Sequence, residues 1–353
     1  MNDSIIKKDM EEIYANGIDY SIFNNKTIII TGAYGMITSY LVKFFLFINQ
    51  LGIKIKIIAL IRNKEKFYKR FPECKGMNNV IMQETDLSEK INIEDKVNYL
   101  IHAASFASPD YYNSCPVEVI KPNVLGTMNL LEFAKTNLNN EGCFIFFSAG
   151  NVYGTCDSNK QITEETFGGL DPLHIYNCYC ESKRMGETLC KAYSVEHNIK
   201  FKSLRIWHTY SPYMNIDKDP RVFASFVKNI RDNENIVIHS DGLGMRSFCY
   251  ITDAISMMLY VILFGNTDEA YNICNTKEYV SIRELANTIV NLRPNKKLKV
   301  VYEQRKDNES YVENVVLKNV KSSPSNAKVI ELGFKPIITI KKGFDRILKY
   351  LEI

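Results

Sequence analysis

Two residues capable of acid–base chemistry, Tyr179 and Lys183, lie four positions apart in the segment CYCESKRMGETLCKAY (178–193). The segment has helical periodicity, so the two side chains are expected on one face of a helix. An ammonium group beside a phenol lowers the pKa of the phenol, which lets a tyrosine act as a base toward a hydroxyl or as an acid toward a ketone. The same spacing is common on amphipathic helices, so the pair indicates catalysis only together with other features.

A glycine-rich turn follows the first apolar segment of the chain. The β-branched run 26–31 predicts a strand, the pattern of 39–51 predicts a helix, and Gly32 and Gly35 lie between them. In such a turn, backbone amides and the helix N-terminus can receive a pyrophosphate, although the third glycine expected for close helix packing is Thr38 here. We therefore expect a site for NAD or NADP. The expected site also includes Tyr34, Met36 and Ile37.

The adenosine end of this expected site carries an unusual residue. An acid about twenty residues beyond the turn normally holds the ribose hydroxyls, but the second apolar run ends in Leu60-Ile61-Arg62-Asn63. Arg62 either meets a 2′-phosphate or is a solvated arginine after a strand. Asp86, where a further strand should end, either accepts a hydrogen bond from the adenine amino group or caps a helix. NAD and NADP therefore both remain open.

The elements that position these residues form a repeating pattern. Apolar runs at 55–61, 97–104 and 143–150 repeat the first strand, with helical stretches between them. Such alternation predicts an α/β fold with a Rossmann-type, doubly wound parallel sheet. After about residue 205 the elements shorten and prolines interrupt them, which indicates a smaller, partly interleaved substrate lobe. The expected division is a helical extension at 1–25, a Rossmann domain at 26–205 and the lobe at 206–353.

Composition excludes several classes of protein. The formal net charge of +4 is small and the basic residues are scattered, so no nucleic-acid partner is expected. Nine cysteines without paired C-x-x-C spacing argue against a disulfide framework and a zinc site and favour a reducing cytoplasm. The N-terminal segment contains acids and no long apolar stretch, so no signal peptide and no membrane association are expected. No metal site is predicted.

The order of the motifs is more specific than any one of them. The glycine turn, HAAS at 102–105, SAGNVYG at 148–154 and the Tyr179–Lys183 pair follow one another as in extended short-chain dehydrogenases/reductases, which the chain resembles from about residue 26 onward. It is most similar to the branch that contains UDP-glucuronate decarboxylases and dTDP-glucose 4,6-dehydratases. Further stretches that carry the resemblance are NCYCESKRMGETLC, LRIWHTYSPYMNIDKDPRVFASFV and GLGMRSFCYITDA.

The resemblance implies roles for particular residues. Tyr179 is the expected acid/base, and Lys183 is expected to bind the nicotinamide ribose. Arg221 and Arg246 match the arginines that hold the diphosphate of a nucleotide sugar, and guanidinium groups suit phosphate oxygens. The resemblance also implies a homodimer formed through two long helices, near 118–135 and around Tyr179. The residues expected to line the cofactor in addition are Leu87, Ala103, Ala104 and Ser105.

Two stretches depart from the pattern of these relatives. Before Val-Tyr-Gly, the relatives place a Thr or Ser followed two residues later by an acid, whereas this chain has Ala149, Gly150 and Asn151. Ser148, one position early, either replaces the missing hydroxyl or faces the opposite way, and Asn151 offers a neutral hydrogen bond to substrate. His208 stands where relatives usually have Asn, and it either contacts substrate or is a satisfied core histidine.

Three functions fit these residues. The favoured one is hydride transfer at C4 of a nucleotide sugar for polysaccharide precursor synthesis, as a 4-epimerase through a 4-keto intermediate or as a 4-ketoreductase. The second is decarboxylation of UDP-glucuronate or 4,6-dehydration, which the missing hydroxyl and acid place in doubt. The third is a dinucleotide-binding protein without catalytic activity, which would not require the Tyr–Lys pair or the two arginines.

Overall fold

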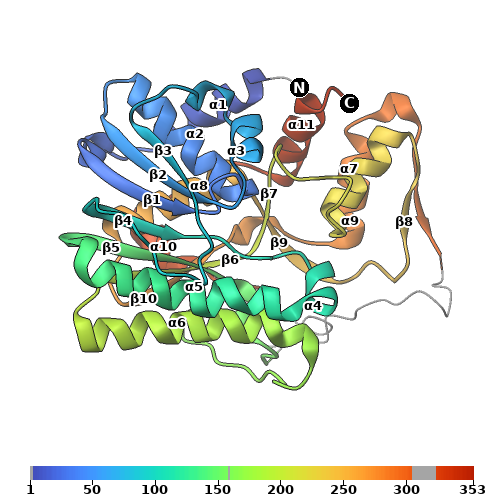
Figure 1. Cartoon of the computed structure of the whole chain (residues 1–353). Coiled ribbons are helices and arrows are strands. Elements are labelled where there is room, and N and C mark those ends of the chain that lie inside the picture. Colours follow the sequence, from blue (N-terminus) through green and yellow to red (C-terminus); the bar gives the residue numbers. More distant parts are fainter. Residues whose placement is uncertain (1–2, 158–159, 304–322) are drawn as a thin grey trace.

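The computed structural model describes residues 3–157, 160–303 and 323–353. At its centre lies a sheet of seven strands in the order β10-β6-β5-β4-β1-β2-β3, and every neighbouring pair is parallel (Figure 1). The strands are β1 (Lys26–Thr31), β2 (Ile55–Ile61), β3 (Val80–Glu84), β4 (Val97–His102), β5 (Leu138–Ala149), β6 (Phe201–Ile206) and β10 (Glu269–Ile273). The predicted α/β doubly wound sheet is confirmed. Strand order reverses between β1 and β4, where such folds bind ligands at the carboxyl ends of the strands.

Helices cover both faces of this sheet because its strands are buried on both sides. Ile28 and Ile30 of β1 pack into the core under α2 (Met36–Gln50) and α8 (Ile251–Phe264), whereas Ile29 between them faces the opposite core. That second core lies against α5 (Pro116–Asn137) and α6 (Cys178–His197), which run side by side below the sheet in Figure 1.

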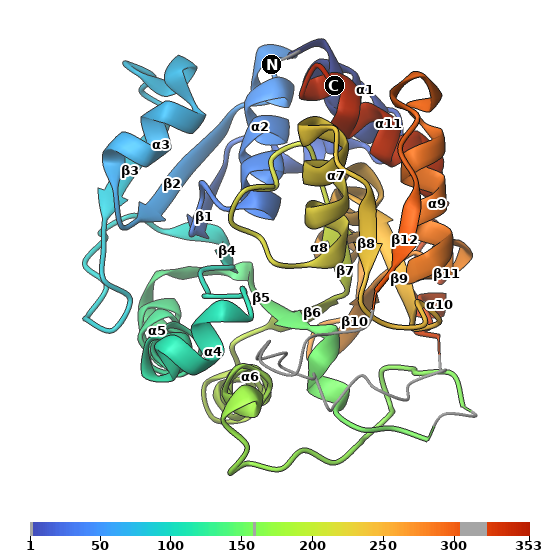
Figure 2. The same ribbon diagram turned by 90° about the vertical axis from the view of Figure 1, so that its right-hand side faces the viewer.

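The shorter elements lie beyond the carboxyl end of β6. The chain continues from β6 into β7 (His208–Tyr210), which pairs with β9 (Met245–Tyr250), and β9 pairs with β11 (Tyr279–Ser281). Figure 2 shows this group beside α7 and α9. Between β9 and β11 the chain returns to the main sheet through α8 and β10, so the two parts of the fold share segments. The other elements are α3 (Lys64–Arg70), α4 (Asp110–Ser114), α7 (Val222–Asp232), β8 (Ile236–Ile238), α9 (Ile282–Asn291), β12 (Val300–Tyr302), α10 (Ala327–Glu331) and α11 (Ile340–Tyr350).

The N-terminal helix α1 (Asp3–Tyr14) is fastened by a buried carboxylate. Asp9 accepts hydrogen bonds from the hydroxyls of Tyr40 at 3.0 Å and Tyr250 at 2.7 Å, and it forms an ion pair with Arg346 at 2.7 Å. Burial raises the pKa of Asp9 to about 6, although these partners act in the opposite direction. The cluster therefore joins α1 to α2, to β9 and to α11.

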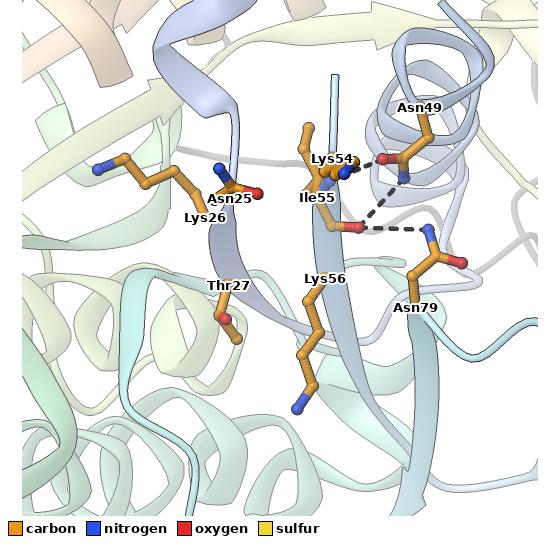
Figure 3. Close-up of a pocket in the computed structure, with 8 residues that line it drawn as sticks. All are labelled: Asn25, Lys26, Thr27, Asn49, Lys54, Ile55, Lys56 and Asn79. Atoms are coloured by element: carbon orange, nitrogen blue, oxygen red, sulfur yellow. Dashed lines mark hydrogen bonds between the residues drawn. The ribbon is translucent and has the colours of Figure 1, made fainter. Parts of the chain in front are cut away.

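A shallow hollow at the amino ends of β1 and β2 faces away from the expected site (Figure 3). The side-chain amides of Asn49 and Asn79 both donate to the carbonyl oxygen of Ile55, at 3.2 and 3.3 Å. These polar residues hold the start of β2 in place. Since ligands of this fold class bind at the opposite, carboxyl ends of the strands, we assign the hollow a structural role.

Among the helices that the structure describes, none combines the length and the apolar composition of a membrane span.

Candidate active site

The glycine turn between β1 and α2 is tight and closely packed. Gly32 has a φ of +63°, which favours glycine, and a Cβ there would lie 3.0 Å from the Cα of Ala104. Gly35 precedes the first residue of α2. Thr38, at the position of the expected third glycine, donates a hydrogen bond of 2.6 Å to the carbonyl oxygen of Gly32. The threonine thus closes the turn, and with Gly35 as its N-cap the N-terminus of α2 has no side-chain cap, so its amides are available to an anion.

A buried network joins the carboxyl ends of β1 and β4. The Thr31 hydroxyl oxygen accepts hydrogen bonds from the backbone N–H groups of Ala103 and Ala104, both at 2.9 Å. Its hydrogen can then be donated to Nδ1 of His102 at 3.0 Å, so Nε2 carries the proton and donates to the carbonyl oxygen of Pro122 at 2.9 Å. Burial lowers the pKa of His102 to about 3, so the imidazole is neutral. The network ends β4 at His102 instead of at the predicted Ala104.

The residues expected at the adenosine end lie near the turn. Arg62 is exposed, and its guanidinium group lies 4.4 Å from the ring centre of Phe106. Asp86 accepts hydrogen bonds from the backbone N–H and the hydroxyl of Ser88, so it caps a local turn. Ser105 has a buried Oγ without a hydrogen-bond partner in the described residues. An unpaired buried hydroxyl beside the glycine turn fits a site that a polar ligand completes.

Tyr179 and Lys183 share a buried face of α6, as the spacing predicts. The Tyr179 ring stacks on Tyr112, with centroids 5.2 Å apart, and Lys183 Nζ lies 5.8 Å from the Tyr179 ring centre. Nζ donates a hydrogen bond of 2.6 Å to the carbonyl oxygen of Phe147. Burial lowers the pKa of Lys183 to about 7, whereas burial raises the pKa of Tyr179. The charge that partly lowers the phenol's pKa is Arg221 and not the lysine, contrary to the expectation from sequence.

The segment that departs from the relatives lies at the end of β5. Ala149 packs in one apolar cluster with Tyr112 and Tyr179, at the position where the family resemblance implies a hydroxyl. Ser148 lies toward Glu187 of α6 and helps to lower the pKa of that carboxyl, so its hydroxyl is directed away from the Tyr179 cluster. Adjacent strand residues face opposite ways, which explains why Ser148 does not take the place of Ala149. Asn151 lies beside the thiol of Cys180.

Three residues expected to contact substrate converge from the shorter elements. His208 lies near both Arg221 and Arg246, and burial together with these two charges lowers its pKa to about 3. The Nδ1 atom of His208 is buried without a hydrogen-bond partner among the described residues, so it is not a satisfied core histidine. Arg221 is held by Asp219, with 2.8 Å between Nε and Oδ1. The cluster presents cations that suit a diphosphate.

Sequence reasoning missed the residues that hold Tyr179 in place. Tyr112 supports its ring, and the Tyr112 hydroxyl donates to the carbonyl oxygen of Ala107 at 3.2 Å. Within α6, the Ser182 hydroxyl donates to the Tyr179 carbonyl oxygen at 2.8 Å, and it accepts from the side-chain amide of Asn123 on α5 at 3.0 Å. The Tyr112–Tyr179 stack and the Asn123–Ser182 hydrogen bond join residues far apart in sequence, so no local pattern signals them.

The described residues fit a dinucleotide, because the tight turn, the free N-terminus of α2 and the unpaired Ser105 hydroxyl lie at the reversal of strand order. They contain no group of three or more His, Cys, Asp or Glu side chains placed to hold a metal ion. Fold and site together define an enzyme class that combines a dinucleotide-binding sheet with a Tyr–Lys pair and an anion-binding lobe.

Comparison with known proteins identifies the family. The model of the NAD dependent epimerase/dehydratase family matches residues 28–274, and the chain belongs to this family. UDP-glucuronic acid decarboxylase 6 of Arabidopsis thaliana is 31% identical over 322 residues, which cover 91% of this chain and 87% of the relative. UDP-glucuronic acid decarboxylase 3 of the same plant is 32% identical over 321 residues, or 90% and 87% of the two chains.

Solved structures show the same fold at lower identity. A UDP-glucose 4-epimerase from Thermotoga maritima with UDP-glucose has a TM-score of 0.76 and 21% identity, over 92% of this chain and 98% of that chain. A UDP-glucuronic acid 4-epimerase from Bacillus cereus, in complex with UDP-glucuronic acid and NAD, has a TM-score of 0.74 and 20% identity, over 92% and 99%. The expected family and the expected cofactor class are confirmed.

Proposed function

We propose that this enzyme transfers hydride at C4 of a nucleotide-activated sugar, as a 4-epimerase or a 4-ketoreductase that serves polysaccharide precursor synthesis. One observation carries the proposal: Arg221, from the segment before α7, lies close enough to Tyr179 on α6 to affect the pKa of its phenol. The acid/base of one part of the fold and an anion-binding group of the other therefore lie at one site. A sugar diphosphate held by Arg221 and Arg246 would place its sugar beside the phenol.

Each residue of the site would have a distinct role in such a reaction. Bound NAD supplies the hydride acceptor or donor. Tyr179 is neutral at pH 7, as an ordinary phenol is, and burial raises its pKa further, so it can donate its proton to a sugar ketone. To accept a proton from a sugar hydroxyl, Tyr179 must itself be deprotonated. A neighbouring cation favours the deprotonated phenol, and Arg221 supplies this charge. Lys183, whose pKa burial lowers to about 7, donates to the carbonyl oxygen of Phe147 and would bind the ribose of the nicotinamide.

Decarboxylation is the second candidate, because the two Arabidopsis thaliana relatives of 31% and 32% identity are named UDP-glucuronic acid decarboxylases. The site argues against it. Ala149 shares an apolar cluster with Tyr179, and Asn151 is neutral where the family resemblance implies an acid. Hydride transfer at C4 needs neither group, since it requires only Tyr179, Lys183 and the nicotinamide.

The test is direct product analysis. The NAD-loaded protein is incubated separately with UDP-glucose, UDP-galactose and UDP-glucuronate, and the nucleotide sugars are examined by mass spectrometry and by chromatography that separates C4 epimers. The 4-ketoreductase arm uses a 4-keto sugar nucleotide with NADH and with NADPH. We expect a C4 epimer or a reduced ketone, and a product lighter by carbon dioxide would favour decarboxylation instead.

The Tyr179→Phe variant separates an enzyme from a binding protein. It removes the transferable proton and keeps the ring that stacks on Tyr112. We expect NAD binding to persist and turnover to fall at least about 100-fold, the lower end of what a general acid–base contributes. Turnover equal to that of the unchanged protein would contradict the proposed role, and absence of turnover in both proteins would favour the inactive alternative.

We further propose that the protein is a homodimer that pairs through α5 and α6. Large apolar side chains are exposed along both helices, and a second copy of the same face would cover them. The exposed residues are Val117, Ile120, Leu125 and Met128 on α5 and Met185 and Val195 on α6. Light scattering of the unchanged protein and of Val117→Glu tests this pairing.

A cytoplasmic location is also proposed, supported by the absence of any disulfide among the nine cysteines.

A further inference from the structure

Two charged side chains of α6 lie one helical turn apart on the side of the helix that packs against the sheet. Lys183 and Glu187 have the spacing i and i+4, which places them on the same face. Gly186, between them, lets α6 approach β5 closely, since a Cβ at that position would lie 2.2 Å from Cζ of Phe146. The lysine is buried and the glutamate side chain is largely buried. Both charges therefore lie between the helix and the sheet.

The amine of Lys183 is fixed by contacts with β5. Nζ donates a hydrogen bond of 2.6 Å to the carbonyl oxygen of Phe147 and lies 5.0 Å from the ring centre of Phe146. An ammonium group has three N–H donors and a neutral amine has two. Because Phe147 takes one donor, the ammonium keeps two for the hydroxyls of a ribose, whereas the neutral amine keeps one. The charge of Lys183 therefore decides how many hydrogen bonds it can offer to the cofactor.

Burial disfavours the charged form of this amine. It lowers the pKa of Lys183 to about 7, and the largest opposing influence is the carboxylate of Glu187. The other titratable groups that face the amine are Tyr179 and Cys190 on the same helix and His102 on β4. All three are neutral at pH 7, because burial raises the pKa of the tyrosine and of the cysteine and lowers that of the histidine to about 3. Of these groups, Glu187 alone carries a negative charge.

The carboxylate of Glu187 is held by the neighbouring strand β6. Arg205 donates from Nε to Oε1 at 3.0 Å and from Nη2 to Oε2 at 2.8 Å, and the Ser203 hydroxyl donates to Oε1 at 2.8 Å. Burial acts to raise the pKa of Glu187, but the hydrogen bonds and the charge of Arg205 hold it below its ordinary value. Ser203 pairs with Phe146 in the sheet, so the carboxylate and the amine of Lys183 lie over the same part of it.

From this arrangement we infer that Glu187 is a positioning residue of the enzyme: its carboxylate, fixed by Arg205, keeps the amine of Lys183 protonated so that the amine can bind the hydroxyls of the nicotinamide ribose. Tyr179, Lys183 and Glu187 thus occupy successive turns of one helix face. The glutamate acts on the cofactor only through the lysine. The inference rests on the proposed function, because it takes from it the binding of a nicotinamide dinucleotide beside Tyr179.

Binding of NAD at different pH values tests this role without any turnover. Calorimetry gives the dissociation constant of NAD for the unchanged protein and for Glu187→Gln between about pH 5.5 and about pH 9. In the unchanged protein, affinity should fall as the pH rises above about 7, where Lys183 loses its proton. In Glu187→Gln the fall should begin about one pH unit lower, since a nearby opposite charge shifts a pKa by about 1–3 units. The variant should therefore bind NAD about 10-fold more weakly near pH 8 and about equally well near pH 5.5.

Three further variants complete the test. Glu181→Gln is the matched control, because it removes the same charge from the same helix at a partly exposed position, 3.7 Å from Arg184, and it should leave the onset of the fall unchanged. Lys183→Met should bind NAD weakly and without this pH dependence. Circular dichroism checks that each variant folds. If Glu187→Gln is misfolded, the double variant with Arg205→Gln, which leaves neither charge buried alone, takes its place and should shift the onset in the same direction.

The possible results separate this inference from the proposed function. Weaker binding of Glu187→Gln at every pH, with an unchanged onset, would mean that the glutamate only supports the helix. That result, or a pH dependence that persists in Lys183→Met, contradicts the inference and leaves hydride transfer possible. Failure of the unchanged protein to bind NAD at any pH contradicts the dinucleotide site, and with it the proposed function.

Discussion

Replacing Thr31 by valine tests the network that supports the cofactor loop. The substitution keeps the shape of the side chain and removes an oxygen that accepts from the N–H groups of Ala103 and Ala104 and contacts Nδ1 of His102. A buried N–H left without a partner costs about 1–3 kcal/mol, and loss of a neutral hydrogen bond costs about 1 kcal/mol. Ala103 and Ala104 are partly exposed, so the lower end applies, and the sum is about 3 kcal/mol.

The assay is urea unfolding followed by circular dichroism, with binding of NAD measured by calorimetry. Thr31→Ser is the first control, because it keeps the hydroxyl and loses only a methyl group. Thr27→Val, at the amino end of the same strand, controls for the preference of valine for β-structure. We expect the free energy of unfolding of Thr31→Val to fall by about 3 kcal/mol. NAD affinity should fall as well, since the loop at 103–105 is released. Equal stability of the valine and serine variants would refute the reasoning.

Two further predictions concern buried charges. Arg346→Met leaves the buried Asp9 carboxylate without its cation and should cost about 3–5 kcal/mol at pH 8, whereas Lys349→Met on the same helix, which breaks an exposed pair, should cost less than about 1 kcal/mol. A loss under about 1 kcal/mol for Arg346→Met in denaturation would contradict the assigned cluster. The pKa of Lys183 is about 7 in the folded protein, below its ordinary value of 10.5. Between pH 7 and pH 10.5 the unfolded chain therefore binds more protons than the folded protein. The free energy of unfolding should consequently rise by about 2 kcal/mol from pH 7 to pH 9 in the absence of cofactor. Lys183→Met should remove this rise, and an unchanged pH profile of unfolding would contradict the shift.

Much of the fold follows from local patterns. The apolar runs placed β1 and β2 correctly, because strands buried on both faces require continuous apolar residues. The strand predicted over 97–104 ends at His102, since the side chain of Thr31, distant in sequence, takes the next two N–H groups. The strand predicted over 143–150 begins earlier, at Leu138, in a polar stretch with no apolar pattern to signal it.

The chemistry of the site divides in the same way. Sequence by itself determined which residue types are available and that Tyr179 and Lys183 share a helix face, because helical periodicity is a local property. It also determined that Ala149 and Asn151 stand where the family resemblance implies a hydroxyl and an acid. Local rules could not decide between Ser148 and Ala149, whose orientations follow from the packing of β5 against α6.

Only the tertiary structure decided how charges act on the site. Burial raises the pKa of Tyr179, and the charge that opposes this effect comes from Arg221, which is distant in the chain. The indole of Trp207 lies on Gly150 because β6 and β5 are neighbours in the sheet. The pKa of a group and the shape of a pocket depend on atoms that surround a residue in space. The sequence determines local helix and strand patterns, and the tertiary fold determines which distant side chains come into contact.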